Sequence, residues 1–216
     1  MEKRADVIII GAGPVGLTLA INLKRLGLSV HVIDKAPQTK REQRACVIWS
    51  RSTEILADLG LIDDFVAASA TLNRATVYAN GRHLGAMTLG SSQSPYPRPL
   101  VIEQNTIEHL LAVHLARLCI DVEWQAEATD IVEVDQSVYV TLTHADGRQE
   151  IIEGQWVVGC EGTRSMLREK MGIVFEGRKR SNLQALQVNA CQSKLSEPQA
   201  EIGQYRAGDI YQMSLL

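Results

Sequence analysis

Three glycines, Gly11, Gly13 and Gly16, have the G-x-G-x-x-G spacing of loops that bind a dinucleotide. They follow a short apolar run at 6–10 and precede an apolar helical pattern, so their context is strand, turn and helix. Gly11 permits a tight turn, Gly13 lets a pyrophosphate approach the backbone, and Gly16 lets the helix lie close to the strand. The motif therefore predicts a phosphate-binding turn.

The helix after these glycines begins with Pro14 and Val15 and is expected to end at Gly27. Its first N–H groups and the positive end of its dipole would face the phosphates. A β-branched run at 30–33 follows and closes on Asp34, about twenty residues beyond the glycines. A carboxylate at that point can accept hydrogen bonds from both hydroxyls of an adenosine ribose, which strengthens the prediction of dinucleotide binding.

Two other interpretations of this stretch are open. The glycines could serve only the packing of an ordinary strand–turn–helix unit. The segment 5–23 is also largely apolar and almost long enough to cross a membrane, but Asp6, Pro14 and Asn22 interrupt it. We therefore expect a soluble protein without membrane partners.

Composition narrows the remaining classes. A chain of 216 residues that is 45% hydrophobic and 22% charged can bury a substantial core. A net charge of −3, without a basic stripe interleaved with aromatics, argues against a nucleic-acid partner. Four dispersed cysteines suit reduced thiols in a cytoplasmic protein better than disulfides, and neither they nor the scattered histidines predict a metal site: Cys46, Cys119, Cys160 and Cys191.

The connection after Asp34 is basic, and most of its charges, between 35 and 44, are those of a solvated loop. Arg44 differs because the apolar run 45–48 follows it directly and should order the chain there. A guanidinium held at that point could bind a phosphate through two parallel hydrogen bonds.

The middle of the chain predicts three helices and one hairpin. The helices are expected at 50–59, 61–70 and 105–118. The last would open with a capping box made by Asn105 and Glu108. Asn80-Gly81 predicts a type I′ turn between strands at 76–79 and 83–87.

From Asp121 the hydrophobic period becomes two, which predicts a β-meander with a turn at Asp146-Gly147. Another apolar strand, 156–158, then stops on the glycine-containing turn 159–162 and leads into a helix. Strands of a parallel sheet finish on the same edge, so the Gly11 loop, Asp34 and this turn should meet at one crevice. Such convergence favours a large cofactor over a single mononucleotide.

With Arg44, Gln104 and the segment 159–162 beside the glycine motif, the chain resembles the FAD-dependent class A monooxygenases over residues 5–177. These are aromatic-ring hydroxylases of the para-hydroxybenzoate hydroxylase type. The resemblance implies that the three motif glycines bind the FAD pyrophosphate. It also implies that Asp34 binds the adenosine ribose, where the family more often has Glu, and Lys35 is assigned to the same cofactor site.

The same resemblance assigns roles to residues farther along the chain. Arg44 would reach the FAD phosphates and Gln104 the ribityl side of the flavin, and the backbone at Ala128 would meet the adenine. Glu161-Gly162 matches the family's Asp-Gly motif, which is credited with roles in FAD and NAD(P)H binding. Glu is one methylene longer than Asp, so a geometry tuned for Asp would be displaced here.

The expected fold is therefore α/β, with a Rossmann-like FAD-binding domain at 1–177 that contains a parallel sheet and a β-meander. The hairpin 76–90 is assigned to the sheet on the substrate side, and 178–216 to the start of a mixed-sheet substrate domain. Family members are longer, and their second flavin motif has no counterpart here, since Gly208-Asp209-Ile210 does not match it. A second chain could supply the remainder.

By resemblance, NAD(P)H would reduce the flavin, which then uses O2 to hydroxylate a small aromatic substrate. No catalytic acid or base is assigned. Two alternatives stay open: a non-catalytic flavin- or nucleotide-binding module, and another FAD oxidoreductase of the same fold, such as a halogenase or an isoprenoid-chain reductase. The Trp-x-Trp-x-Ile signature expected of a halogenase is absent from the sequence.

Overall fold

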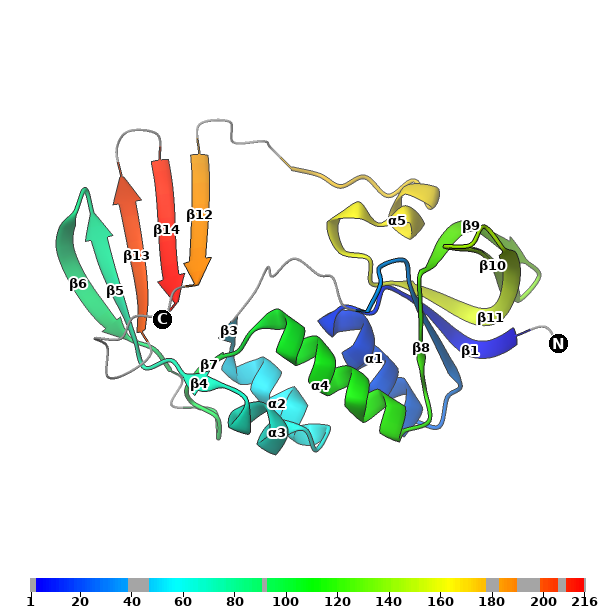
Figure 1. Ribbon diagram of the computed structural model, residues 1–216, viewed down its shortest axis with the longest axis horizontal. Coiled ribbons are helices and arrows are strands. Elements are labelled where there is room, and N and C mark those ends of the chain that lie inside the picture. The colour runs from blue at the N-terminus through cyan, green and yellow to red at the C-terminus, as the bar shows by residue number, and fades with distance from the viewer. Residues whose placement is uncertain are drawn as a thin grey trace. The chain divides into compact units, whose positions relative to one another are not determined.

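The computed structural model describes residues 3–38, 47–90 and 93–177, and the backbone of strands at 183–189, 199–205 and 209–215. The chain divides into two compact units. The first unit comprises Met1–Arg44 and Gln104–Phe175, and the second comprises Ala45–Glu103 and Glu176–Leu216. Each is described separately, with the element labels of Figure 1.

The first unit is built on a six-stranded sheet in the order β8-β2-β1-β11-β10-β9. Its strands are β1 (Lys3–Ile10), β2 (Val30–Asp34), β8 (Val122–Trp124), β9 (Ala126–Val134), β10 (Ser137–His144) and β11 (Gln149–Gly159). The strands β8, β2, β1 and β11 run parallel, while β9, β10 and β11 form an antiparallel meander. The predicted combination of parallel sheet and meander is confirmed.

The strand β8 differs from its prediction. The period-two pattern placed Val122 and Trp124 at the start of the meander, whereas β8 pairs parallel with β2 at the edge of the sheet. The reason is topological: a helix precedes β8, and a helical crossover returns the chain parallel to the strand before it.

Both faces of β1 are covered, which explains its unbroken apolar sequence. Ile8, Ile10 and Ile33 pack into a core with the meander. The intervening Ile9 and Val32, also fully buried, point to the other face because side chains alternate along a strand. That face is covered by two helices that lie side by side, α1 (Pro14–Arg25) and α4 (Gln104–Arg117) (Figure 1).

The ends of α1 follow the sequence signals, but the start of α4 does not. Gly13 is the N-cap of α1, Pro14 is its first residue, and Gly27 ends it with a φ of +84°. The capping box predicted for Asn105 is wrong, because Gln104 is already helical. Its side-chain amide donates to the buried Glu108 carboxylate at 2.8 Å, one helical turn away.

The second unit contains two short helices and two sheets. The helices are α2 (Ser50–Asp58) and α3 (Ile62–Ala67). A three-stranded sheet has the order β3-β7-β4, from β3 (Val47–Ile48), β4 (Ala70–Thr71) and β7 (Leu100–Val101). A five-stranded sheet has the order β12-β14-β13-β5-β6, from β5 (Arg74–Ala79), β6 (Arg82–Thr88), β12 (Leu183–Asn189), β13 (Gln199–Tyr205) and β14 (Asp209–Leu215).

The predicted hairpin is confirmed and one predicted helix is too long. Asn80 and Gly81 have φ values of +49° and +75°, as a type I′ turn between β5 and β6 requires. The strand β5 also pairs parallel with β13, which places the hairpin in the five-stranded sheet. The helix α3 ends at Ala67 rather than at residue 70, because Ala70 is taken up in β4 and pairs with Val101.

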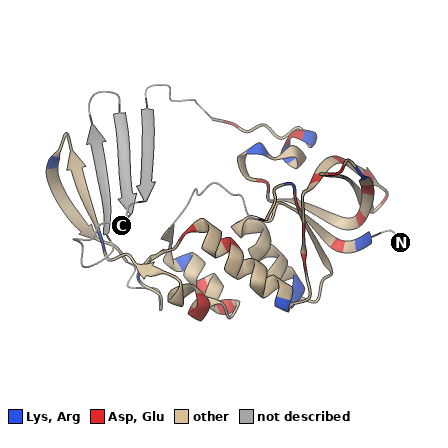
Figure 2. Cartoon of the chain, in the orientation of Figure 1, with Lys and Arg blue, Asp and Glu red and all other residues tan. Residues whose placement is uncertain are grey.

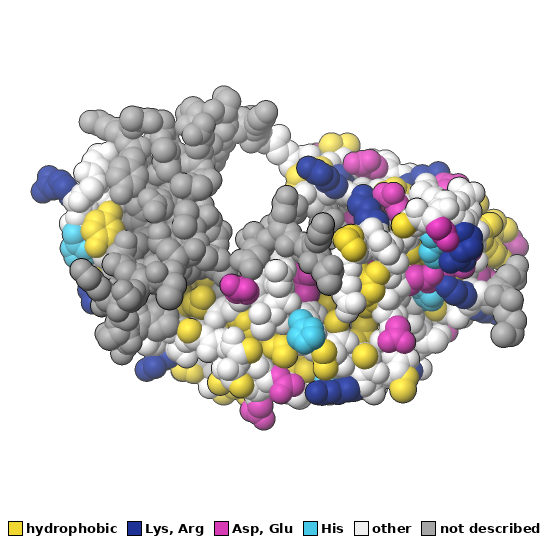
Figure 3. All heavy atoms as spheres, viewed as in Figure 1, with side chains coloured by type: hydrophobic (Ala, Val, Ile, Leu, Met, Phe, Trp, Pro, Cys, Tyr) yellow, Lys and Arg dark blue, Asp and Glu magenta, His cyan; other side chains and the backbone are white. Residues whose placement is uncertain are grey.

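Charges of both signs are interspersed over β1 and β9–β11 in the first unit (Figure 2). The space-filling view shows hydrophobic side chains scattered among charged ones over the described part of the same face (Figure 3). No helix among the described residues is long and apolar enough to cross a membrane.

Candidate functional site

The carboxyl ends of three neighbouring strands of the first unit meet at one edge of its sheet. Ile10 at the end of β1 lies in register with Ile33 of β2 and Gly159 of β11. Backbone hydrogen bonds continue the pairing past the strands, from the N–H of Gly11 to the Ile33 carbonyl at 2.8 Å and from the N–H of Cys160 to the Ile10 carbonyl at 2.7 Å. The predicted convergence of these segments is confirmed.

Two glycines of the motif occupy places that no other residue fits. A Cβ on Gly11 would lie 2.5 Å from the carbonyl oxygen of Cys160, and Gly11 has a φ of +105°. A Cβ on Gly16 would lie 1.9 Å from the carbonyl oxygen of Gly11. The sequence predicted that Gly16 lets α1 lie close to the strand. In the structure, the first turn of α1 also lies directly against the backbone of Gly11, and close to Cys160 after β11.

A pocket of about 570 Å³ opens at this edge, within the size range of small-molecule and cofactor sites. Four segments of the first unit line it: the end of β1, the end of β2, the start of β9 and the turn after β11. The lining residues predicted from the sequence are Gly11, Asp34, Lys35, Ala128 and Glu161.

Asp34 ties the end of β2 to the glycine loop. Its Oδ2 accepts a hydrogen bond from the N–H of Ala12 at 2.7 Å, and its Oδ1 accepts one from the N–H of Ala36 at 2.8 Å. A carboxylate oxygen can accept more than one hydrogen bond, so these two contacts do not by themselves prevent a ligand hydroxyl from donating to Asp34. Asp34 thus shapes the loop and faces the pocket at the same time.

Lys35 and Glu127 form an ion pair between two walls of the pocket. The Lys35 Nζ lies 3.1 Å from Oε1 of Glu127, and both side chains are more than half exposed. Such an exposed pair contributes little to stability. It can open at little cost, which leaves the Lys35 ammonium free to meet an anion.

The Glu161 carboxylate lies beside Gly159 at the end of β11 and accepts hydrogen bonds at the start of the short helix α5 (Met166–Lys170). Its Oε1 accepts from the N–H of Met166 at 2.9 Å, and its Oε2 accepts from the Ser165 hydroxyl at 2.7 Å and the N–H of Leu167 at 3.3 Å. The longer Glu side chain reaches a full set of donors at the start of this helix.

The turn after β11 offers a thiol that stays protonated. Burial, and secondarily the negative charge of Glu161, raise the pKa of the half-buried Cys160. A thiol with a raised pKa is a poor nucleophile at neutral pH. Cys160 therefore packs beside Gly16 rather than performing nucleophilic catalysis.

The remaining predicted residues lie near the pocket edge or away from its lining. Gly13 and Pro14 start α1, Val15 is 70% exposed on its first turn, and Gly162 has a φ of +77° at the start of a 3-10 turn. Gln104 lies at the start of α4, bonded to Glu108. Arg44 lies outside the described residues.

Sequence reasoning missed several lining residues: Ala126, Glu127, Thr129, Thr163, Arg164 and Met166. One signal was present. At the start of β9 small alanines alternate with polar residues, and this pattern leaves space beside the backbone. Arg164 adds a cation to the pocket. Its place two residues after Gly162, in the turn predicted to reach the site, was a signal for it.

Comparison with known proteins gives consistent matches along most of the chain. The profile of a family described as FAD binding domain matches residues 4–207. The 6-methylpretetramide 4-monooxygenase of Streptomyces rimosus is 36% identical over 182 residues, which are 82% of this chain and 32% of that protein. The para-nitrophenol 4-monooxygenase of Pseudomonas sp. strain WBC-3 is 29% identical, over 82% of this chain and 45% of that one.

Solved structures agree. The p-nitrophenol 4-monooxygenase PnpA from Pseudomonas putida DLL-E4 matches with a TM-score of 0.76 and 26% identity, over 82% of this chain and 46% of that one. The flavin-dependent monooxygenase PieE, solved with FAD and substrate, shares the fold with a TM-score of 0.74 at 23% identity, over 81% and 33%. The chain thus spans between about a third and less than half of the length of these relatives.

Proposed function

Because the chain belongs to the family of FAD-binding domains, we propose that it is the FAD-binding part of an NAD(P)H- and O2-dependent flavoprotein monooxygenase. Its substrate would be an aromatic or similar small molecule, a proposal supported by relatives named as monooxygenases of 6-methylpretetramide and para-nitrophenol. The observation that carries the proposal is the pocket at the shared edge of β1, β2 and β11, closed by the glycine loop.

The residues of this edge fit the dinucleotide half of FAD. The space that a Cβ would take at Gly11 and Gly16 is filled by the backbone carbonyl oxygens of Cys160 and Gly11, so these two glycines allow the loop, α1 and the turn after β11 to pack closely. Within that loop, the approach of the pyrophosphate to the backbone is assigned to Gly13. The first turn of α1 carries no acidic residue, so nothing there opposes the attraction of its dipole for phosphate. Lys35 and Arg164 add cations to the pocket lining.

Each predicted residue would then hold one portion of the cofactor. The loop 11–16 and Arg44 would bind the pyrophosphate, Asp34 the ribose, and the backbone at Ala128 the adenine. Gln104 would contact the ribityl side of the flavin, and Glu161-Gly162 would take part in FAD and NAD(P)H binding.

When bound, FAD would supply the redox chemistry, accepting a hydride from NAD(P)H and using O2 to oxidise the substrate. The residues of this chain would bind and orient the cofactor. No general acid or base is assigned among them. Exclusion of water from the flavin would depend on the part of the longer relatives that this chain does not match. The same chain or a second chain would have to supply that part. A cytoplasmic location, without nucleic-acid or membrane partners, belongs to the same proposal.

A second candidate is a nucleotide-binding module without turnover of its own. It is favoured by the limited share of the relatives that the chain covers, 32% and 46% in the first relative and structure compared. Another FAD oxidoreductase on the same fold is the third. Oxidation of NAD(P)H above the rate of free FAD separates the catalytic candidates from the module.

The binding proposal is tested by titrating the purified chain with FAD and with ADP in a calorimeter. We expect both to bind and to compete, and Gly16→Ala to abolish binding because its Cβ would displace the glycine loop. Gly85→Ala is the matched control, since its Cβ would meet nothing within 4 Å. Binding of neither ligand, or full binding by Gly16→Ala, would overturn the assignment of the pocket.

A further inference from the structure

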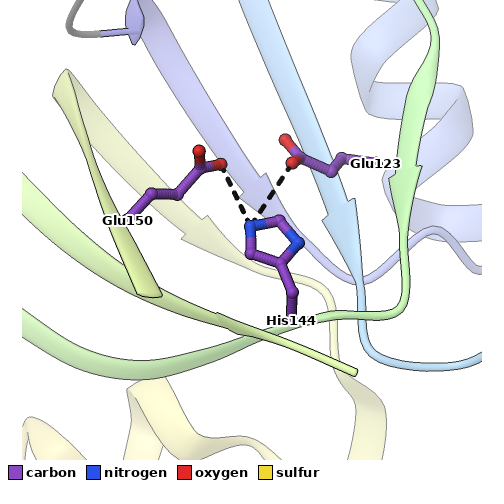
Figure 4. A group of neighbouring side chains, drawn as sticks. All are labelled: Glu123, His144 and Glu150. Carbon is purple, nitrogen blue, oxygen red and sulfur yellow. Dashed lines mark ion pairs between the residues drawn. The ribbon is translucent and has the colours of Figure 1, made fainter. Parts of the chain in front are cut away.

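Four titratable side chains from four strands of the first unit meet away from the nucleotide pocket. Glu123 comes from β8, His144 from β10 and Glu150 from β11, as Figure 4 shows, and His31 comes from β2. The His144 Nε2 lies 3.3 Å from Oε1 of Glu150 and 3.8 Å from Oε1 of Glu123. The His31 Nε2 lies 2.7 Å from Oε2 of Glu123.

His144 is the least satisfied member of the group. Its Nε2 is buried and has no hydrogen-bond partner among the described residues, although its ring points between the two carboxylates (Figure 4). Only 11% of the side chain is exposed, so water is largely excluded from it. A buried nitrogen without a partner is costly and requires an explanation, of which a bound ion is one.

We propose that Glu123, His144 and Glu150, whose ligand atoms all lie within 4.8 Å of one another, bind a divalent first-row transition ion such as Zn²⁺, and that His31 orients Glu123 as its hydrogen-bond partner. Imidazole nitrogens and carboxylate oxygens are established ligands of this ion, and with three protein ligands a water would complete the tetrahedron. Two ligands each about 2.1 Å from a tetrahedral ion lie roughly 3.4 Å apart, a value between the distances from His144 to the two carboxylates. Small movements would complete the site.

Lys3 now holds the place of the cation. Its Nζ lies 2.9 Å from Glu123 Oε2 and 2.9 Å from Glu150 Oε1. The side chain is 44% exposed, so it can turn into solvent when an ion enters. Arg148 pairs with the other oxygen of Glu150 at 3.0 Å and is the remaining cation that faces the group. The ammonium is therefore a competitor, and its removal should favour the metal.

The bound ion would join strands that are distant in the sequence. It would link the edge strand β8, and through His31 the parallel strand β2, to the β10–β11 hairpin of the meander. The ion is thus expected to stabilise the first unit without taking part in the reaction at the nucleotide pocket.

The test uses the full chain, free of any histidine tag and of metal. Zn²⁺ is titrated by calorimetry, and Co²⁺ by its visible absorption. We expect one ion per chain, a tetrahedral Co²⁺ spectrum and a higher Tm with Zn²⁺. His144→Gln should weaken binding at least about tenfold, since loss even of an outer partner costs that much. Lys3→Met should tighten it, and His109→Gln, at an exposed position of α4, should change nothing.

The proposal fails if neither the wild type nor Lys3→Met binds one ion, or if His144→Gln binds as tightly as the wild type. It also fails if Lys3→Met leaves the affinity unchanged. Should His144→Gln not fold, Glu150→Gln and the exposed Lys3→Met carry the test. Circular dichroism of each metal-free variant establishes folding before the titration.

Discussion

At the scale of single residues, Asp34 makes backbone contacts that the sequence did not predict. Its position at the end of β2 predicted contact with a ribose, whereas the structure shows both oxygens already accepting from the backbone N–H groups of Ala12 and Ala36. The side chain therefore fixes the loop that would receive the pyrophosphate, and its contact with the ribose remains a prediction.

We expect Asp34→Ala to weaken FAD binding by about 1.5–3 kcal/mol, the scale of hydrogen bonds to a charged group. Asp34→Asn keeps one acceptor oxygen and should lose less. Calorimetric titration of FAD measures both variants. Glu127→Gln, which breaks only an exposed ion pair of the same pocket, is the control and should stay within about 1 kcal/mol of the wild type. An unchanged titration of Asp34→Ala would remove Asp34 from the site.

At the scale of elements, two side chains cap the start of α5: the hydroxyl of Ser165, which accepts from the N–H of Arg168 at 3.1 Å, and the carboxylate of Glu161. The helix has only five residues, too few to be stable alone, and the Glu161 carboxylate accepts from two of its first N–H groups. The residue that departs from the family's Asp-Gly motif is thus one of the two residues that cap the helix beside the pocket.

Glu161→Ala should lower the free energy of unfolding by about 1 kcal/mol, as loss of a helix cap does. Glu161→Asp should lose most of the same amount, because the shorter side chain cannot reach Met166 and Leu167. Urea unfolding of each variant provides the measurement. Glu169→Ala serves as control, since Glu169 lies on the same helix, is 71% exposed and meets only Arg168 at 3.5 Å. Full stability of Glu161→Asp would show that the cap does not depend on the extra methylene.

The junction of β1, β8 and β11 predicts a dependence of stability on pH. A hydrogen bond from Lys3, assisted by one from Arg148, lowers the pKa of Glu150 from its ordinary 4.5 to about 2. Since the folded pKa lies below the unfolded one, this stabilisation is complete above pH 4.5 and is lost as the pH falls toward 2.

In metal-free buffer we therefore expect the free energy of unfolding to fall between pH 5 and pH 2, and to fall less steeply in Glu150→Gln. Other carboxyls with lowered pKa values, such as Asp6 and Asp130, contribute to the slope in both proteins. Urea unfolding at several pH values gives the two curves. Glu133→Gln, at an exposed position of β9, should follow the wild type. Parallel curves for Glu150→Gln and wild type would contradict the assignment.

The elements that the sequence predicted well carry their own local signals. In 6–27 these signals are the apolar run of the strand, the spacing of the glycines and the apolar pattern of the helix. For the type I′ turn the signal is the Asn80-Gly81 pair. Errors arose where a distant partner decides the structure. Ala70 leaves α3 to pair with Val101, and β8 leaves the meander to pair with β2. The His31–Glu123–His144–Glu150 group was invisible for the same reason, because its members come from four separate strands.

At the scale of the whole molecule, the two compact units are not contiguous in the sequence. The chain leaves the first unit after Arg44, returns at Gln104 and leaves again after Phe175. A division of the chain at residue 177 follows composition and resemblance, and it remains a prediction. Nevertheless, the pocket is assembled entirely from the first unit, through strand ends that the pairing of β2, β1 and β11 brings together. The parallel register was sufficient to predict at which edge of the sheet the pocket lies, but not the wall that β9 contributes.

The chain covers only part of the length of its relatives, and this affects how much FAD we expect it to retain. By our proposal the pocket holds the adenine, ribose and pyrophosphate, whereas the relatives contain more sequence than the part that this chain matches. We therefore expect the purified chain to carry FAD sub-stoichiometrically, and ADP to compete for the site. The visible absorption spectrum of the chain as isolated, before and after addition of FAD, measures the occupancy. A full complement of tightly bound flavin would contradict this expectation, because it would mean that the chain supplies the flavin-side contacts by itself.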